Sequence, residues 1–231
     1  IHSSAASDVY KRQIMRSGEF NKDVLDILLT NVRMPEQNWG DLKAQIAAVQ
    51  IGDRRVKEMI AKFGADTFRD GIEDLLDYAE TQARAVIADL PDGEYFFADY
   101  MDEDAVDGWP CRIALNLIIK GDVCTFDFST SDPQLESSMN IPTGGEERHV
   151  MMLVGLVYVL YTLDPTLFLN SGVTRVCRCI LPKGTIVNPE FPAAVGMRTL
   201  SSMRLQEITF GAFVQAAPDR LPASPCSGGP I

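Results

Sequence analysis

The chain has 231 residues, of which 46% are hydrophobic and 23% charged, so it can build one core or two small ones. Its formal net charge of −11, without a cluster of Lys and Arg, excludes the basic surface that nucleic acids or anionic membranes attract. Its five scattered cysteines are typical of reduced thiols in a cytoplasmic protein. The longest apolar run, Val150–Leu160, is about half the length of a membrane-spanning helix. We therefore expect a cytoplasmic, globular chain.

The two ends of the chain lack a periodic apolar pattern. Residues 1–13 have no helix cap, and Ser3–Gln13 resembles translated adapter sequence, so we interpret 1–13 as a non-native, disordered leader. Residues 224–231 belong to a Pro/Gly/Ser-rich tail that completes no element, which we interpret as truncated. Between them we expect a helical region, 14–93, and an α+β region, 94–223.

Helical periodicity dominates the first of these regions. A short helix is expected from Asn21 to a point before Pro35. Asp41 is a plausible N-cap for a longer helix that Gly64 ends, and a further helix runs from Phe68 to Leu90. Because the joint between the last two is very short, the sequence predicts a long antiparallel helical hairpin.

After Gly93 the apolar period changes to two. The segments Tyr95–Tyr100, Cys111–Ile119 and Val123–Phe128 predict an antiparallel β meander, whose last hairpin turns at Lys120-Gly121-Asp122.

The rest of the chain mixes helices with a further strand. The expected elements are a buried helix Arg148–Leu163, a strand Thr174–Leu181 and a final helix Thr199–Ala217 capped by Thr199. Because strands and helices do not alternate as regular βαβ units, the fold class is α+β.

Common catalytic motifs are missing from this sequence. It contains no phosphate-binding G-x-x-x-x-G-K-[ST], no G-x-S-x-G and no H-E-x-x-H. His149 opens an apolar helix, where a capping role is expected. Cys177 and Cys179 lack a second pair of ligands and are predicted to be small core residues, so no metal site is assigned.

The polar loop that follows the meander is the candidate binding segment. Its candidate substrate-binding residues, with Arg198 before the last helix, are Asp127, Ser129, Ser131, Asn140, Thr143 and Arg198. Hydroxyls, a carboxylate, an amide and a glycine pair gather before a helix start, which suits an anionic or carbonyl ligand. The alternative is a surface connection whose side chains satisfy turns and caps. No residue is assigned as catalytic.

Several of these segments resemble the hydantoinase B/oxoprolinase family. The resemblance is carried in order by Asn31–Pro35 (Asn-x-Arg-x-Pro), Gly40–Gln45 (Gly-Asp-Leu-x-Ala-Gln), Gly52–Arg55 (Gly-x-Arg-Arg) and Pro182–Ala194, within Ile14–Ala223. It departs from the family at Thr130, where the family tends to have Gly.

The resemblance implies the B-type subunit of an ATP-dependent cyclic-amide hydrolase, of hydantoinase or 5-oxoprolinase type. A hydantoinase A-type partner would use ATP to phosphorylate the amide oxygen of a small cyclic amide, and the activated species would then be hydrolysed. The full enzyme would also hold a divalent metal, at a His/Asp segment that in the family precedes the region matched here. The resemblance therefore implies an internal fragment that is inactive alone.

Two other functions fit the same residues. The related ketone carboxylases, of acetone carboxylase type, share the resemblance, so a carboxylase subunit is an alternative. A scaffold that builds an interface through its helical hairpin, without chemistry of its own, is the other.

Overall fold

The computed structural model describes residues 12–104 and 106–223. The predicted leader 1–13, apart from Arg12 and Gln13, and the predicted tail 224–231 lie outside the described residues. The chain divides into two compact units, Ile1–Arg69 and Asp70–Ile231, and each is described by itself.

The first unit combines a small hairpin with two helices. Its elements are β1 (Met15–Arg16), β2 (Glu19–Phe20), α2 (Lys22–Thr30) and α3 (Pro35–Phe63). The side chain of Asn21 caps α2 by accepting a hydrogen bond from Val24 N at 3.4 Å. As predicted, Gly64 ends α3, with a φ of 86° that glycine adopts readily.

The start of α3 lies further upstream than the sequence pattern indicated. Asp41 is inside the helix and does not cap it, because Pro35 occupies the first turn. The N–H groups in the first turn of a helix have no partner within the helix, so a proline, which has no N–H, loses no hydrogen bond there. The fixed φ of proline also suits the start of a helix.

Little of the first unit is buried. Among its described residues Leu25 is the buried apolar side chain, and α3 buries none of its residues. Trp39 packs edge-on against Phe20, with ring centroids 5.2 Å apart. The antiparallel pairing of α3 with the next helix stays a prediction.

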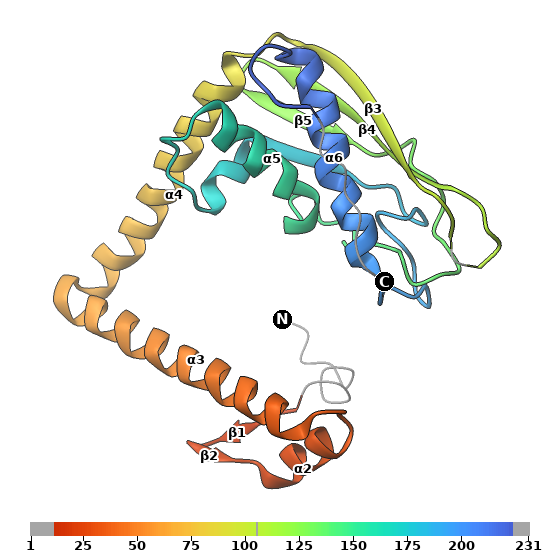
Figure 1. Cartoon of the computed structure of the whole chain (residues 1–231). Coiled ribbons are helices and arrows are strands. Elements are labelled where there is room, and N and C mark those ends of the chain that lie inside the picture. Colours follow the sequence, from red (N-terminus) through yellow and green to blue (C-terminus); the bar gives the residue numbers. More distant parts are fainter. Residues whose placement is uncertain (1–11, 105, 224–231) are drawn as a thin grey trace. The chain divides into compact units, whose positions relative to one another are not determined.

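The second unit contains the sheet and the main core (Figure 1). The helix α4 (Ala65–Ala88) begins in the first unit and continues into the second. The remaining elements of the second unit are, in chain order, β3 (Gly93–Met101), β4 (Cys111–Lys120), β5 (Val123–Asp127), α5 (Val150–Leu163), the 3-10 helix η1 (Ser171–Val176), β6 (Cys177–Ile180) and α6 (Arg198–Ala216). The sheet order is β3-β4-β5-β6. The predicted meander β3-β4-β5 is antiparallel, and β6 adds a parallel strand beside β5.

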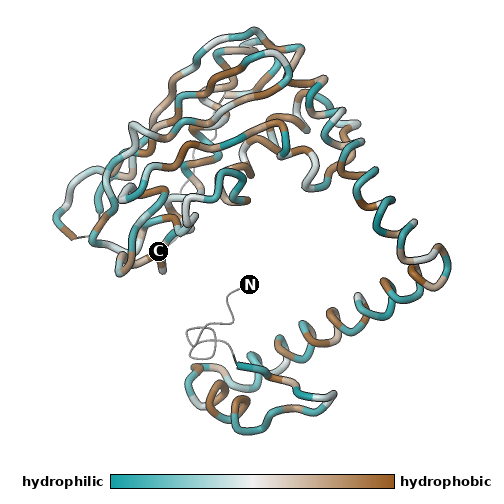
Figure 2. Tube along the Cα trace, turned by 180° about the vertical axis from the view of Figure 1, so that it is seen from behind, coloured by the Kyte–Doolittle hydropathy of each residue, from teal (hydrophilic) through white to brown (hydrophobic). Residues whose placement is uncertain are grey.

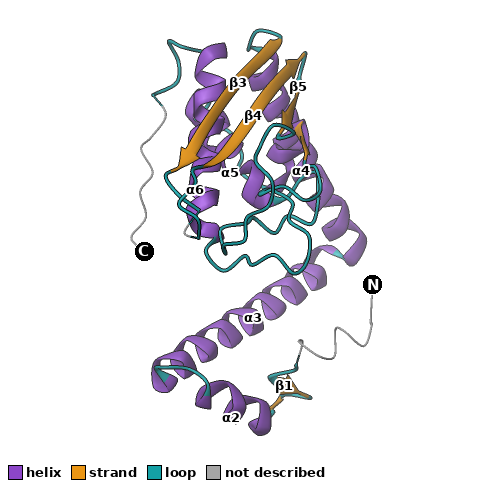
Figure 3. Cartoon of the chain, turned by 90° about the vertical axis from the view of Figure 1, so that its right-hand side faces the viewer, coloured by secondary structure: helices purple, strands orange, loops and turns teal. Residues whose placement is uncertain are grey.

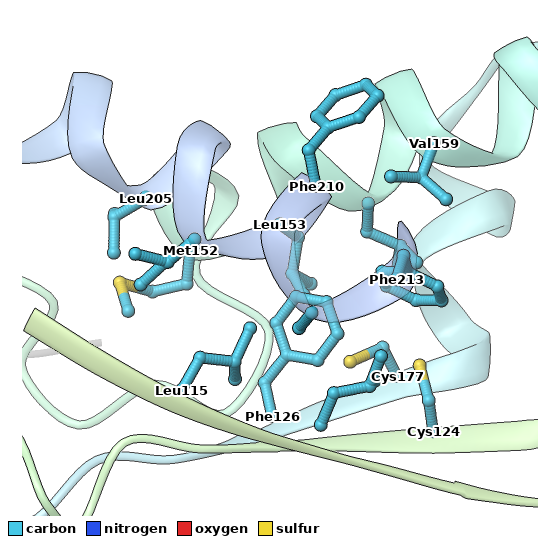
Figure 4. Packing of buried hydrophobic residues seen from close by; sticks show 14 of the residues in the cluster. Leu115, Cys124, Phe126, Met152, Leu153, Val159, Cys177, Leu205, Phe210 and Phe213 are labelled. Carbon is cyan, nitrogen blue, oxygen red and sulfur yellow. The ribbon is translucent and has the colours of Figure 1, made fainter. Parts of the chain in front are cut away.

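The helices α5 and α6 lie on one side of this sheet (Figure 3). Along β4 the residues Ile113, Leu115 and Leu117 are buried beneath them, while Arg112 and Asn116 are partly exposed on the other face. Phe126 on β5 and Phe213 on α6 meet in this core, with ring centroids 6.1 Å apart (Figure 4). The α+β class is therefore confirmed. No helix among residues 12–104 and 106–223 is long and apolar enough to cross a membrane.

Three local expectations for this unit are corrected. The predicted strand Thr174–Leu181 is shorter, because residues 171–176 form η1 and the strand begins at Cys177. The helix α6 begins at Arg198 without a side-chain cap, so Thr199 is not its N-cap. The turn between β4 and β5 consists of Gly121 and Asp122 only, because Lys120, which was expected in the turn, still pairs with Val123.

The thiols of this core are shielded from solvent. As predicted, Cys177 and Cys179 are buried core residues, and Cys111 and Cys124 are buried too. Burial raises the pKa of Cys111 to about 11, and burial also raises the pKa of Cys177 well above its usual value.

These buried thiols should react slowly in the native chain. At pH 8 we expect Cys111 and Cys177 to react with a thiol-specific disulfide reagent at least ~100-fold more slowly than in urea, because little thiolate forms. Because folding raises the pKa of both thiols, their contribution to stability is present below the unfolded-state pKa of about 8.5 and is lost as the pH rises through the folded value. Mass-spectrometric mapping of the labelled cysteines measures the rates. Equal rates in buffer and in urea would contradict the described burial.

Candidate functional site

The polar loop between β5 and α5 begins by continuing the sheet. Where β5 ends, Ser131 takes its place beside β4: its Oγ accepts a hydrogen bond from Ala114 N and donates one to Ala114 O, each at 3.1 Å. Asp132 follows, and its Oδ2 accepts a hydrogen bond from Arg112 N at 2.8 Å. The side chains of Ser131 and Asp132 thus make the hydrogen bonds to β4 that the backbone of β5 makes before it ends, and Ser131 is buried.

Asn140 joins the middle of the loop to a segment more than fifty residues further along the chain. Its side chain is 0% exposed. Its Oδ1 accepts from Leu135 N at 2.8 Å, and its Nδ2 donates to the carbonyls of Leu135, Ser137 and Ala194 at 2.9, 3.0 and 2.9 Å. Both hydrogens of the amide are therefore occupied by the backbone.

Thr143 makes a similar connection at the end of the loop. Its buried Oγ1 donates to Val187 O at 2.6 Å and accepts a hydrogen bond from Gly145 N at 3.3 Å. The backbone supports the same contact, since Ile141 N donates to Ile186 O at 2.8 Å. Ser131, Asn140 and Thr143 therefore hold the loop in place.

The remaining candidates have side chains nearer to solvent. Asp127, the last residue of β5, is partly exposed, and its Oδ1 accepts a hydrogen bond from Ser129 N at 2.8 Å. Ser129 is exposed. Arg198 is exposed at the first turn of α6, where its Nη1 lies 3.4 Å from Val195 O. Nearby, Met197 N donates to Ser138 O at 2.8 Å, which brings the start of α6 against the loop.

The structure adds residues that sequence reasoning missed. Arg112 donates through Nη2 to Thr130 O at 2.6 Å and forms an ion pair with Asp132 at 3.7 Å. Asn188 donates to Leu181 O at 2.8 Å and anchors the facing loop. The buried hydroxyl of Ser137 has no hydrogen-bond partner among the described residues. The sequence signalled Arg112 weakly, because its partners Thr130 and Asp132 lie 18 and 20 residues further along the chain.

A metal does not fit the described part of the chain. Between residues 12 and 223, with residue 105 set aside, no group of three or more His, Cys, Asp or Glu side chains is arranged to hold an ion. His149 is occupied as the N-cap of α5, as predicted, and accepts a hydrogen bond from Met151 N at 3.4 Å.

The fold and this loop together define an α+β protein in which helices cover one face of a mixed sheet and hydrogen-bonded side chains fix a polar loop at the end of β5. The sequence pattern of the Hydantoinase B/oxoprolinase family matches residues 8–229, and the chain belongs to that family.

Relatives of known name support this assignment. The chain is 34% identical to the B subunit of a putative D-/L-hydantoinase from Pseudomonas sp. strain NS671, over 91% of this chain and 37% of that protein. It is 30% identical to the beta subunit of the caprolactamase from Pseudomonas jessenii, over 92% of this chain and 36% of that protein. The 5-oxoprolinase of Dictyostelium discoideum is 27% identical, over 91% of this chain and 17% of that protein.

A solved structure shares the fold as well. The crystal structure of the ATP-dependent caprolactamase from Pseudomonas jessenii matches with a TM-score of 0.77 and 30% identity, over 90% of this chain and 35% of that one. The chain thus spans about a third of the length of the hydantoinase and caprolactamase subunits that it matches.

Proposed function

We propose that the chain forms part of the B-type subunit of an ATP-dependent cyclic-amide hydrolase. The observation that carries the proposal is the match to the ATP-dependent caprolactamase, which extends over 90% of this chain at 30% identity. An A-type subunit supplies the ATP-using site, and the substrate is a small cyclic amide. The proposal assigns the complex to the cytoplasm, where the free thiols of Cys111 and Cys177 stay reduced.

The chemistry of a cyclic amide explains why ATP is needed. An amide carbonyl is a poor electrophile, and phosphorylation of its oxygen creates a leaving group. In the proposed reaction the γ-phosphate moves to the amide oxygen and ADP departs. Water then attacks the amide carbon, and the ring C–N bond breaks with proton transfer to nitrogen, which leaves an acyl phosphate. A second water attacks the carbon of the acyl phosphate, the C–O bond to the phosphoryl group breaks, and phosphate leaves with the original amide oxygen. A divalent metal in the full enzyme would be held by residues other than the described ones, and no step is assigned to it.

Ring opening by the complete complex tests this function. The complete B-type subunit, purified with its A-type partner, is assayed with hydantoin, 5-oxoproline and caprolactam, with and without ATP. We expect at least one of these rings to open when ATP is present and none to open without it. Ring opening without ATP, or ATP-dependent carboxylation of a ketone in its place, would overturn the proposal.

Within this function we propose a division of roles among the candidates. Asp127, Ser129 and Arg198 face the substrate or its phosphorylated form, and Ser131, Asn140 and Thr143 hold the loop that carries them. The partial or full exposure of the first group and the occupied hydrogen bonds of the second support the division. A guanidinium such as that of Arg198 is suited to phosphate and carboxylate.

Replacing Arg198 should lower activity without loosening the fold. In the complete complex we expect Arg198→Ala to lower kcat/KM at least ~10-fold, about 1.4 kcal/mol of transition-state stabilisation. Thr199→Ala, a change at the neighbouring exposed position, is the matched control and should leave kcat/KM within ~2-fold. Steady-state kinetics with a thermal unfolding scan measures both variants. An Arg198→Ala enzyme as active as the control would return Arg198 to a surface role.

A further inference from the structure

The helix α3 carries an apolar seam that the described residues of its own unit leave partly or fully exposed. We define the seam by Leu42, Ile46, Val49, Val56, Ile60 and Phe63, which recur at the a and d positions of a heptad, with Asp53 at the remaining a position. No residue of α3 is buried, and Val49, Val56 and Phe63 are 72%, 44% and 47% exposed. Figure 2 shows hydrophobic and hydrophilic residues alternating along the length of α3.

A groove runs beside the N-terminal half of the seam. Its volume is about 340 Å³, and it is lined by Ile14, Met15, Leu42, Gln45, Ile46, Val49 and Gln50. A second helix laid on the seam would fill this groove with apolar side chains.

We propose that α3 pairs antiparallel with α3 of a second copy of this chain. In an antiparallel coiled coil an a residue faces a d residue of the other helix. One register satisfies this rule along the seam: Leu42 faces Ile60 of the second copy, Ile46 faces Val56, and Val49 faces Asp53. The two-fold axis of the dimer lies near Ile51. Each of these three contacts therefore occurs twice, with the roles of the two copies exchanged, and the interface is self-complementary.

The charge at Asp53 favours the antiparallel arrangement. A parallel pair would bury Asp53 directly against Asp53 of the second copy, and like charges repel strongly away from water. In the antiparallel register Asp53 meets Val49, and its carboxylate keeps its ion pair with Lys57 on the same helix, at 2.8 Å.

Gly52 supports the same register. Glycine within a helix is unfavourable, and a Cβ at Gly52 would meet none of the described residues within 4 Å, so no contact among them requires a glycine. In the proposed dimer Gly52 lies beside Gly52 of the second copy, next to the axis. The absence of side chains there allows the two helices to approach closely.

The chain's own α4 is the competing occupant of the seam. Ala79, Ala83 and Val86 of α4 are already buried in the core of the second unit. That leaves Ile72 and Leu75, 43% and 49% exposed, and the partly exposed Phe68 near the joint as apolar surface. A hairpin joined at Gly64 would bring these residues beside the C-terminal end of the seam and leave Leu42 and Ile46 without a partner.

Sedimentation equilibrium of the full 231-residue chain tests the dimer. At about 50 µM we expect a mass of twice 25.5 kDa, given a dissociation constant on the order of 1 µM. Val49→Asp sets a carboxylate against Asp53 of the second copy, and we expect it to weaken the dimer at least ~100-fold. Ile51→Asp is the matched control: Ile51 is 52% exposed on the same helix but lies off the seam, so the dimer should weaken less than ~3-fold.

A stabilising variant separates pairing from damage to the fold. Asp53→Leu replaces the charged a position with an apolar one and should tighten the dimer at least ~10-fold, with unchanged helix content by circular dichroism. A monomeric wild-type chain at 50 µM, as expected if α4 covers the seam, would overturn the proposal. Equal weakening by Val49→Asp and Ile51→Asp would overturn it as well.

Discussion

Replacing Asn140 by Ala is expected to lower the free energy of unfolding of the second unit by about 3–5 kcal/mol. The amide is 0% exposed and bonds to Leu135, Ser137 and Ala194. Its removal takes this partner from one N–H and three carbonyls of the backbone, of which those of Leu135 are partly buried, that of Ser137 is buried and that of Ala194 belongs to an exposed residue. Each unpaired buried group costs about 1–3 kcal/mol, reduced where the loop can shift toward water. Urea denaturation followed by circular dichroism measures the change.

A partly exposed asparagine provides the matched control for Asn140. Asn116 on β4 makes a longer hydrogen bond of 3.3 Å to Glu94, so Asn116→Ala should cost less than about 1 kcal/mol. If the two variants unfold at the same urea concentration, Asn140 does not hold the loop. Its amide would then be free for the ligand role that the sequence suggested.

Replacing Phe126 by Ala should destabilise the same unit by about 3–5 kcal/mol. Phe126 is 0% exposed, and its ring centroid lies 6.3 Å from that of Phe128 and 6.1 Å from that of Phe213. Figure 4 shows Phe126 and Phe213 in the core. Alanine removes these contacts and leaves a cavity where the sheet meets α6, and the close-packed surroundings can fill it only partly. Urea denaturation again gives the magnitude.

Phe96 on β3 is the matched control for this core position. It is 52% exposed, so Phe96→Ala should cost less than about 1 kcal/mol. An equal loss for Phe96→Ala and Phe126→Ala would mean that the core does not lie between the sheet and α6.

Local sequence patterns were sufficient for much of the fold. The alternation in Cys111–Ile119 identified β4, and its buried and partly buried residues follow that alternation except at Ala114, which is buried. Gly64 was identified as the end of α3 because a positive φ there suits glycine. The apolar run from Val150 marked α5, whose buried residues include Leu153 and Leu156.

Other features depend on contacts that no local pattern contains. The parallel pairing of Cys124 with Cys177 joins strands more than fifty residues apart, so the position of β6 could not be read from its own residues. In the same way, α4 was grouped with the helices before it by its period, whereas its Ala79 and Ala83 are buried in the core beside the sheet.

The candidate site shows the same limit. Ser131, Asn140 and Thr143 were singled out because polar residues clustered before a helix start. Whether such a residue binds a ligand or a neighbouring backbone depends on distant partners such as Ala114, Val187 and Ala194. Composition places polar groups in one loop, and tertiary contacts decide how many of them remain free.

The fate of the amide oxygen tests the proposed function most directly. A cyclic amide labelled with ¹⁸O at its carbonyl is supplied with ATP to the complete B-type subunit and its A-type partner, and the released inorganic phosphate is analysed by mass spectrometry. If the amide oxygen is phosphorylated before the ring opens and water then cleaves the acyl phosphate at its C–O bond, as proposed, the label must appear in the phosphate. Label that stays wholly in the carboxylate of the opened product would contradict the account.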